Sequence, residues 1–161
     1  MRFGAYGTLA ALLALPVQPV AAQTTTQTAT QTATLVVHVE KTVAGGILRL
    51  GLYDAAGYPD DDAKPVASAD VPAQAGRTSV TLTGLAPGTY AIQAYQDRNG
   101  NGKMDSSWLG LPLEPYGFSR DATPRLSKPG FDRVKFAVTA GANSQTFSLQ
   151  NTGSPQNTGG R

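Results

Sequence analysis

The chain has 161 residues, with 13 lysines and arginines, 11 aspartates and glutamates, and no cysteine. A formal net charge of +2 is too small for the basic surface that binds nucleic acid or an anionic membrane, so the overall charge predicts neither partner. The absence of cysteine excludes disulfides, thiol chemistry and cysteine-ligated metals, so the fold must depend on its hydrophobic core.

The first 22 residues have the composition of a secretory signal peptide. Arg2 is their only charge, an apolar run occupies residues 9–15, and Val20 and Ala22 are small residues where a signal peptidase reads the chain. A membrane anchor is the alternative, but the run is shorter than the roughly 20 residues that span a bilayer. We expect cleavage after Ala22, export to the periplasm or the extracellular space, and no membrane insertion of the mature chain.

Low-complexity segments flank a single domain. Residues 23–33 are rich in threonine, glutamine and alanine, and residues 151–161 are polar and rich in glycine. Neither segment can bury enough apolar surface to offset the entropy of ordering it, so we expect a disordered linker and a disordered tail. The signal peptide at 1–22 and these two segments leave one folded domain over residues 34–150.

Within this domain, short segments of alternating apolar and polar residues are separated by turn residues. Alternation with a period of two is typical of strands that are half-buried in a sheet. With about seven strands and no helical stripe, the expected fold is an all-β, antiparallel two-sheet sandwich, immunoglobulin-like or transthyretin-like. The segments, of which 65–71 is the weakest, are 34–41, 47–54, 65–71, 77–84, 88–97, 132–139 and 144–150.

Two turns and a core follow from the same pattern. The glycines of residues 43–46 are typical of a hairpin turn between the first two strands. Residues 85–90, LAPGTY, resemble the corner of a sandwich at which a tyrosine hydroxyl, here that of Tyr90, bonds to upstream backbone. The apolar positions predict a core that contains Leu50, Leu52, Val80, Leu82, Ile92, Val134 and Phe136.

Residues 97–105, DRNGNGKMD, have the ligand spacing of a calcium loop. Asp97, Asn99, Asn101 and Asp105 occupy positions 1, 3, 5 and 9, position 6 is glycine, and Lys103 at position 7 would offer its carbonyl. Hard oxygen donors without histidine or cysteine suit calcium. The alternative is a run of Asx-turns, because asparagine and aspartate also bond to their own backbone. A phosphate loop is disfavoured by the acidic residues and by the lack of a following helix.

This loop departs from the helix-loop-helix calcium motif in two ways. Trp108 stands at position 12 in place of a bidentate glutamate, and a strand precedes the loop where that motif has a helix. The missing ligands would come from elsewhere, with Glu114 and Asp121 as candidates. Two formal carboxylates beside basic residues predict weak binding, roughly 10⁻⁴ to 10⁻³ M.

The longest segment without alternation, residues 106–131, contains several aromatic and charged residues. Loops of this length inside a compact domain are usually functional or folded back as lids. A face that binds a small ligand or a glycan could be formed by Trp108, Glu114, Tyr116, Phe118 and Arg120. The favoured alternative is that the three aromatic residues of this set cap an open end of the sandwich core.

The second half of the domain also resembles a known family. The sequence GTYA at 88–91 is followed by DRNGNGKMD at 97–105, GLPLEPYGFS at 110–119 and FDRVKF at 131–136. This pattern is similar to the bacterial secreted family known as domain of unknown function 2141, and the resemblance extends over about residues 34–149. That family carries no established activity. The resemblance therefore implies a small exported β-domain and no particular reaction.

Residues typical of an enzyme are not found. His38, the only histidine, lies in an alternating segment where a solvated face is expected, and neither a G-x-S-x-G nor an H-E-x-x-H motif exists. The acidic residues 60–62 are expected to form a solvated turn, with a second cation site as the alternative. Glu114 with Asp105 or Asp121 could imitate a glycosidase carboxylate pair, but the sequence does not fix their separation.

These observations predict an exported, monomeric, non-enzymatic β-sandwich module, stabilised by weakly bound calcium in the 97–105 loop. A module that binds a small ligand or a glycan through the 106–131 segment is the alternative. The expected partner is accordingly an envelope protein or a glycan.

Overall fold

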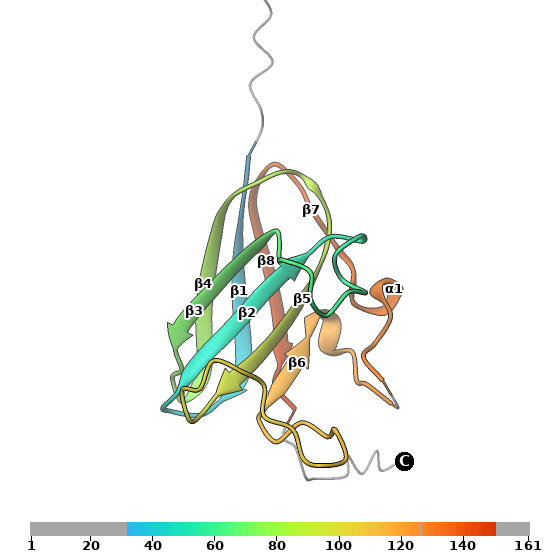
Figure 1. Ribbon diagram of the computed structural model, residues 1–161. Coiled ribbons are helices and arrows are strands. Elements are labelled where there is room, and N and C mark those ends of the chain that lie inside the picture. Colours follow the sequence, from blue (N-terminus) through green and yellow to red (C-terminus); the bar gives the residue numbers. More distant parts are fainter. Residues whose placement is uncertain (1–31, 126, 151–161) are drawn as a thin grey trace, which may run out of the picture.

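The computed structural model describes residues 32–125 and 127–150. The expected signal peptide, nearly all of the expected linker and the expected tail lie outside these residues. Eight strands and two short helical turns make up the described chain (Figure 1). In chain order they are β1 Ala33–Thr42, β2 Ile47–Tyr53, β3 Ala67–Pro72, β4 Gly76–Leu85, β5 Gly88–Asp97, β6 Tyr116–Phe118, η1 Ser119–Asp121, α1 Phe131–Val134, β7 Phe136–Val138 and β8 Gly141–Ser148.

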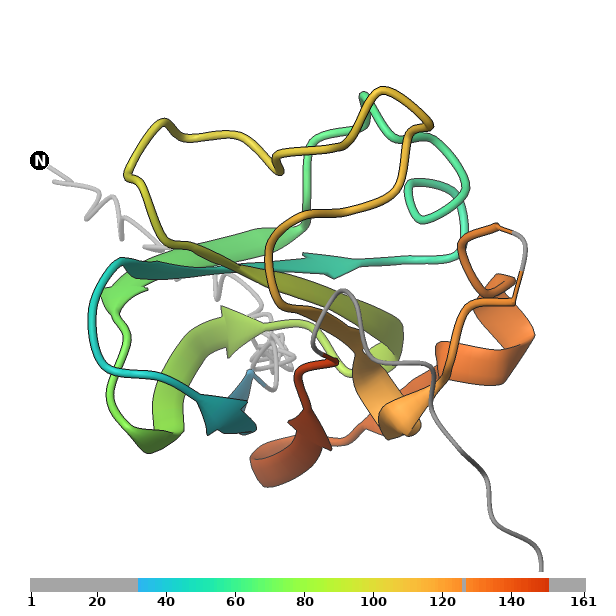
Figure 2. The same cartoon turned by 90° about the horizontal axis from the view of Figure 1, so that it is seen from below.

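The strands form two sheets that face each other across the core (Figure 2). The small sheet has the order β4–β1–β8, and the large sheet has the order β3–β2–β5–β6, with β7 paired to the first residues of β5. The prediction of an all-β two-sheet sandwich is confirmed. All strand pairs are antiparallel except β1 and β8, which run parallel because β8 starts beside Ala33, at the beginning of β1.

The core lies between the inner faces of the two sheets, as the alternation predicts. In β2, for example, Leu48, Leu50 and Leu52 are buried, whereas Arg49 and Gly51 face away from the small sheet and are partly exposed. Burying side chains of this size removes apolar surface from water at roughly 25 cal/mol per Å², which is the main stabilising contribution in a chain without disulfides. The seven residues predicted for the core are all buried: Leu50, Leu52, Val80, Leu82, Ile92, Val134 and Phe136.

The prediction of a hairpin turn at 43–46 is wrong. β1 and β2 belong to different sheets, so this segment crosses from one sheet to the other. The fully buried side chain of Gln96 fixes the crossing. Its Oε1 accepts the N–H of Val43 (3.1 Å), and its Nε2 donates to the carbonyls of Val43 (2.8 Å) and Gly45 (2.7 Å). Glycines serve a crossing as well as a hairpin, which is why the sequence did not distinguish the two.

Two segments after β5 also differ from expectation. Residues 132–139 were expected to form one strand, but α1 ends at Val134 and β7 begins at Phe136. The apolar positions are still buried, Phe136 and Val138 in the core between the sheets and Val134 in a second cluster with Ala91 and Phe118. Within the irregular 106–131 segment, residues 116–118 form β6 on the edge of β5. A strand this short has too few residues to show alternation.

The corner at residues 85–90 is confirmed. The Tyr90 hydroxyl donates to the carbonyl of Ala86 at 2.9 Å, which ties the start of β5 to the turn before it. Within the two described ranges, no helix has the length and apolar character needed to cross a membrane.

Candidate functional site

The 97–105 loop is closed by its own hydrogen bonds around Asp97. Asp97 is fully buried; its Oδ1 accepts the N–H groups of Gly100 (2.7 Å) and Asn101 (3.2 Å), and its Oδ2 accepts that of Gly102 (2.8 Å). The Nε of Arg49 from β2 donates to the same Oδ2 at 3.0 Å. Burial alone would raise the pKa of Asp97, but the N–H of Gly102, the Arg49 guanidinium and the N–H of Gly100 together lower it. Arg49 is therefore the counterion of this carboxylate.

The remaining expected calcium ligands bond to one another and to the backbone. The Nδ2 groups of Asn99 and Asn101 donate to the Asp105 carboxylate at 2.6 and 2.8 Å. Their Oδ1 atoms accept the N–H groups of Asn101 (3.1 Å) and Lys103 (2.8 Å), which are Asx-turns. The amide nitrogens, not the oxygens, thus face Asp105. Calcium binding stays a prediction, and these hydrogen bonds favour the Asx-turn alternative.

The other carboxylates considered for a metal have structural partners. Glu114 is buried, and its two oxygens accept the N–H groups of Arg98 (2.7 Å) and Asp105 (3.2 Å). Asp121 accepts the N–H of Ser148 at the end of β8 (2.7 Å). Among the described residues, no group of three or more histidine, aspartate or glutamate side chains is placed to hold a metal ion. Glu114 fastens the end of the 106–113 segment to the start of the 97–105 loop.

The five residues proposed for a ligand-binding face are not brought together. Trp108 is 92% exposed, so it does not cap the core, whereas Phe118 is buried and Tyr116 is half-buried. Arg120 is exposed and donates to the carbonyl of Lys135 (3.4 Å). Tyr116 and Phe118 lie on the outer face of β6, where both line a groove. Trp108, Glu114 and Arg120 do not line it.

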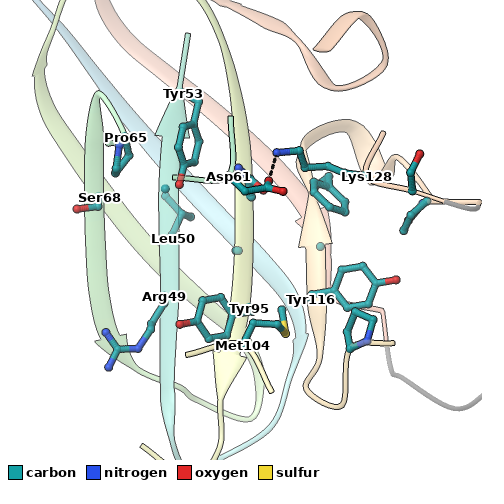
Figure 3. Close-up of a pocket in the computed structure, with 18 of the residues that line it drawn as sticks. Arg49, Leu50, Tyr53, Asp61, Pro65, Ser68, Tyr95, Met104, Tyr116 and Lys128 are labelled. Carbon is teal, nitrogen blue, oxygen red and sulfur yellow. Dashed lines mark hydrogen bonds and ion pairs between the residues drawn. The ribbon is translucent and has the colours of Figure 1, made fainter. Parts of the chain in front are cut away.

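This groove lies on the outer face of the large sheet and encloses about 780 Å³. Its floor consists of outward-facing residues of β2, β3, β5 and β6 (Figure 3). Loop residues complete the walls: Asp61 and Pro65 before β3, residues 110–112 after the 97–105 loop, and Pro124, Arg125, Ser127 and Lys128 before α1. Figure 2 shows the loops after β2 and after β5 on the side of the large sheet that faces away from the small sheet.

Strand pairing places the floor residues in two rows across the sheet. In the first row Asp70, Arg49, Tyr95 and Tyr116 are neighbours on β3, β2, β5 and β6. In the second row Ser68, Gly51, Gln93 and Phe118 lie in the same order. The second row has two small residues, Ser68 and Gly51, next to Gln93 and Phe118.

Gly51 also determines where Tyr53 lies. A Cβ at Gly51 would be 2.6 Å from Cε2 and 2.9 Å from Oη of Tyr53, so the tyrosine ring lies flat over the glycine. Burial raises the pKa of Tyr53, Tyr95 and Tyr116, so all three hydroxyls are neutral near pH 7 and can donate hydrogen bonds. The groove therefore combines aromatic faces with neutral donors.

Most charged groups of the groove are paired. Arg49 bridges Asp70 and Asp97, and Lys128 pairs with Asp61 and donates to the carbonyl of Tyr58 (2.8 Å). Arg125 is exposed at the wall and forms no ion pair within the described part of the chain. The groove is thus polar without a strong field of either sign.

Of the floor residues, the sequence predicted Tyr116 and Phe118 as ligand-binding residues and missed those on β2, β3 and β5, because only the buried side of each strand was considered. Arg49 and Tyr53 alternate with the core leucines of β2, and Gln93 and Tyr95 alternate with Ile92 and Ala94 of β5. Aromatic residues and arginine at outward positions of neighbouring strands were the available signal. The expected solvated sites match the structure: His38 is partly exposed and bonded to Ser79 Oγ (Nδ1 to Oγ 2.8 Å), and residues 60–62 are exposed.

The sequence comparisons identify the family. Residues 35–146 match the family described as "Uncharacterized protein conserved in bacteria (DUF2141)". The chain belongs to DUF2141. The matched residues contain the large sheet and every part of the groove, so the groove lies within the DUF2141 domain. Neither a curated protein nor a solved structure matches the chain.

Proposed function

We propose that this DUF2141 protein is an exported, non-enzymatic module that binds a small polar ligand of the saccharide type in the groove of the large sheet. The observation that carries the proposal is the groove itself. Its volume of about 780 Å³ lies within the roughly 300–1,000 Å³ of small-molecule sites, and such sites combine aromatic walls with a few placed polar groups. Tyr53, Tyr95 and Tyr116 supply the aromatic surface.

The chemistry of the floor supports a saccharide over a purely apolar ligand. A sugar ring presents C–H groups on its faces and hydroxyl groups around its edge. Tyrosine rings can cover the C–H faces, while Gln93, Ser68 and the Arg49–Asp70 pair can exchange hydrogen bonds with hydroxyls. Because Arg49 is already neutralised by two carboxylates, the ligand does not need to carry charge to meet it.

Several observations support a binding role over catalysis. A general acid at neutral pH needs a carboxyl group with a raised pKa. The pKa of Asp97 and the pKa of Asp132 are both lowered, that of Asp132 chiefly through its hydrogen bond with Lys135. His38 lies on β1 of the small sheet, on the other side of the core from the groove.

Export is the part of the proposal that rests on residues 1–22. The charge at Arg2, the apolar run at 9–15 and the small residues Val20 and Ala22 support it. Mass analysis of the protein recovered from the producing bacterium should give Gln23 as the first residue. A cytoplasmic chain that still begins at Met1 would overturn this part and leave the groove proposal intact.

Binding can be tested by titrating the protein with a panel of neutral and acidic saccharides, with amide chemical shifts as the readout. We expect shifts that concentrate on β2, β5 and β6. Tyr95→Ala should weaken binding by about tenfold or more, since it removes the aromatic face at the centre of the floor. His38→Ala is the matched control, because it changes an outward-facing strand residue of the other sheet and should leave the affinity unchanged. Shifts elsewhere, or equal affinity for Tyr95→Ala, would refute the site.

A further inference from the structure

The 97–105 loop contains two successive asparagine–glycine pairs, Asn99–Gly100 and Asn101–Gly102, and the sequence has no other such pair. Gly100 has φ +74° and Gly102 has φ +79°, so the turns of this loop favour glycine at both positions. Asparagine is a thermolabile residue, and a following glycine has no side chain to shield its backbone nitrogen. The loop therefore combines two sequences that are prone to deamidation.

Deamidation of such a pair begins at the glycine nitrogen. This nitrogen loses its proton and attacks Cγ of the preceding asparagine. A bond from the nitrogen to Cγ forms, the bond from Cγ to Nδ2 breaks, and Nδ2 leaves with a proton as ammonia. Water then opens the resulting succinimide ring to give aspartate or isoaspartate. The reaction thus needs a glycine N–H that is free to lose its proton and an asparagine side chain that is free to turn toward it.

Burial does not protect either pair. Both asparagines and both glycines are exposed to water. Within the part of the chain that the structure describes, a Cβ at Gly100 would meet nothing within 4 Å, and one at Gly102 would meet only the guanidinium of Arg49, at 3.7 Å. Any protection of the two pairs must come from hydrogen bonds.

The Asp97 carboxylate occupies both glycine N–H groups. Gly100 donates to its Oδ1 (2.7 Å) and Gly102 to its Oδ2 (2.8 Å). Loss of either proton would create a second anion beside a buried one, which is unfavourable. Burial raises the pKa of Asp97, but the N–H of Gly102, the Arg49 guanidinium and the N–H of Gly100 lower it overall, and a carboxylate of lowered pKa is a poor base for these protons.

The asparagine side chains are held as well. The Nδ2 atoms of Asn99 and Asn101 donate to the Asp105 carboxylate at 2.6 and 2.8 Å. Their Oδ1 atoms accept the N–H groups of Asn101 (3.1 Å) and Lys103 (2.8 Å). A side chain must give up both of its bonds before it can turn toward the glycine nitrogen that follows it.

We propose that Asn99 and Asn101 are paired deamidation sites that the Asp97 carboxylate keeps closed in the folded protein. Deamidation at either site would replace an amide donor by a carboxylate that faces Asp105, and the two negative charges would repel each other. Because Gly102 lines the groove of the large sheet, an opened loop would also change the wall of the groove.

The unchanged protein gives the first test. It is kept in mildly alkaline buffer, with and without enough urea to unfold it, and then cleaved after Arg98 and Lys103, which releases the peptide NGNGK. Mass spectrometry of its fragments measures deamidation at the two asparagines separately. We expect deamidation in the folded protein to be slower than in urea by at least about tenfold, since a hydrogen bond to a charged group must break first.

Asn143 is the internal reference for a slow site, because serine follows it. In urea, Asn99 and Asn101 should deamidate faster than Asn143. Equal rates for the three asparagines in urea would show that the pairs are not deamidation sites. Equal rates for the pairs in folded and unfolded protein would show that the fold does not protect them. Either result would overturn the proposal.

Two variants assign the protection to Asp97. Asp97→Ala removes the acceptor of both glycine N–H groups, so both pairs should deamidate at a rate that approaches the rate in urea. Glu114→Ala is the matched control, because it also removes a buried carboxylate that accepts backbone N–H groups of this loop and leaves both glycines bound to Asp97. Its rate should stay near that of the unchanged protein. Circular dichroism shows that each variant is folded.

Amide hydrogen exchange of the unchanged protein measures the same contacts without a substitution. We expect slow exchange at Gly100 and Gly102, although both residues are exposed. Fast exchange at these glycines would contradict the proposal. A folded Asp97→Ala protein with an unchanged deamidation rate would also contradict it. Equal acceleration in Asp97→Ala and Glu114→Ala would assign the protection to the general order of the loop and not to Asp97.

Discussion

Replacing Gln96 with methionine removes the three hydrogen bonds that hold the crossing between the two sheets. Methionine has nearly the same length and no amide, so the N–H and carbonyl of Val43 and the carbonyl of Gly45 lose their partner. The side chain at this position is fully buried, so water cannot take its place. At about 1 kcal/mol net for each hydrogen bond, we expect the free energy of unfolding to fall by about 3 kcal/mol.

The measurement is urea unfolding at equilibrium, followed by circular dichroism. Gln145→Met is the matched control, because Gln145 is a partly exposed strand residue of β8 whose side chain makes no hydrogen bond in the described chain. Amide hydrogen exchange adds a local readout, since the N–H of Val43 should exchange faster in Gln96→Met and at the original rate in the control.

The reasoning would be refuted by a loss below about 0.5 kcal/mol, which is the range of ordinary surface substitutions. It would also be refuted if both variants lost the same free energy, because the loss would then reflect methionine in a strand and not the crossing.

Three further predictions follow from the loop and the core. Arg49 and backbone N–H groups already occupy the Asp97 carboxylate, so we expect equal melting temperatures in EDTA and in about 10 mM calcium. If calcium instead raised the free energy of unfolding by about 2.7 kcal/mol, the stabilisation given by a ligand at about 100 times its Kd, the loop would be a calcium site. Burial raises the pKa of Tyr58, whose hydroxyl has no partner in the described chain, so stability should be full below about pH 10 and fall as the pH rises above it. Tyr58→Phe should make this fall smaller and keep the stability at pH 7, and the remaining fall should come from Tyr53, Tyr95 and Tyr116. Tyr90→Phe should lose about 1 kcal/mol in urea unfolding. Leu82→Ala should cost roughly 2 to 5 kcal/mol in the same measurement, and a cost near zero would contradict its burial.

The candidate site was only partly predictable from the sequence. The Asx-rich loop was located correctly, because aspartate and asparagine bond to backbone a few residues away and this chemistry is local. Its counterion was not, since Arg49 is 48 residues from Asp97 and reaches it only because β2 pairs with β5. Trp108 was expected either to belong to a binding face or to cap the core, but the turn of residues 107–110 leaves it exposed and outside the groove, and apolarity alone does not reveal that.

For the fold, the sequence by itself determined which face of each strand is buried. Successive side chains of a strand point to opposite sides, so alternation along β1, β2, β4 and β5 is sufficient to assign inside and outside. It was not sufficient to assign partners. Only the tertiary structure decided that residues 43–46 cross between sheets, that β8 runs parallel to β1, and that three loop segments wall a groove over the large sheet. These features depend on contacts between distant segments, and a periodicity of two is the same whichever strand lies beside it.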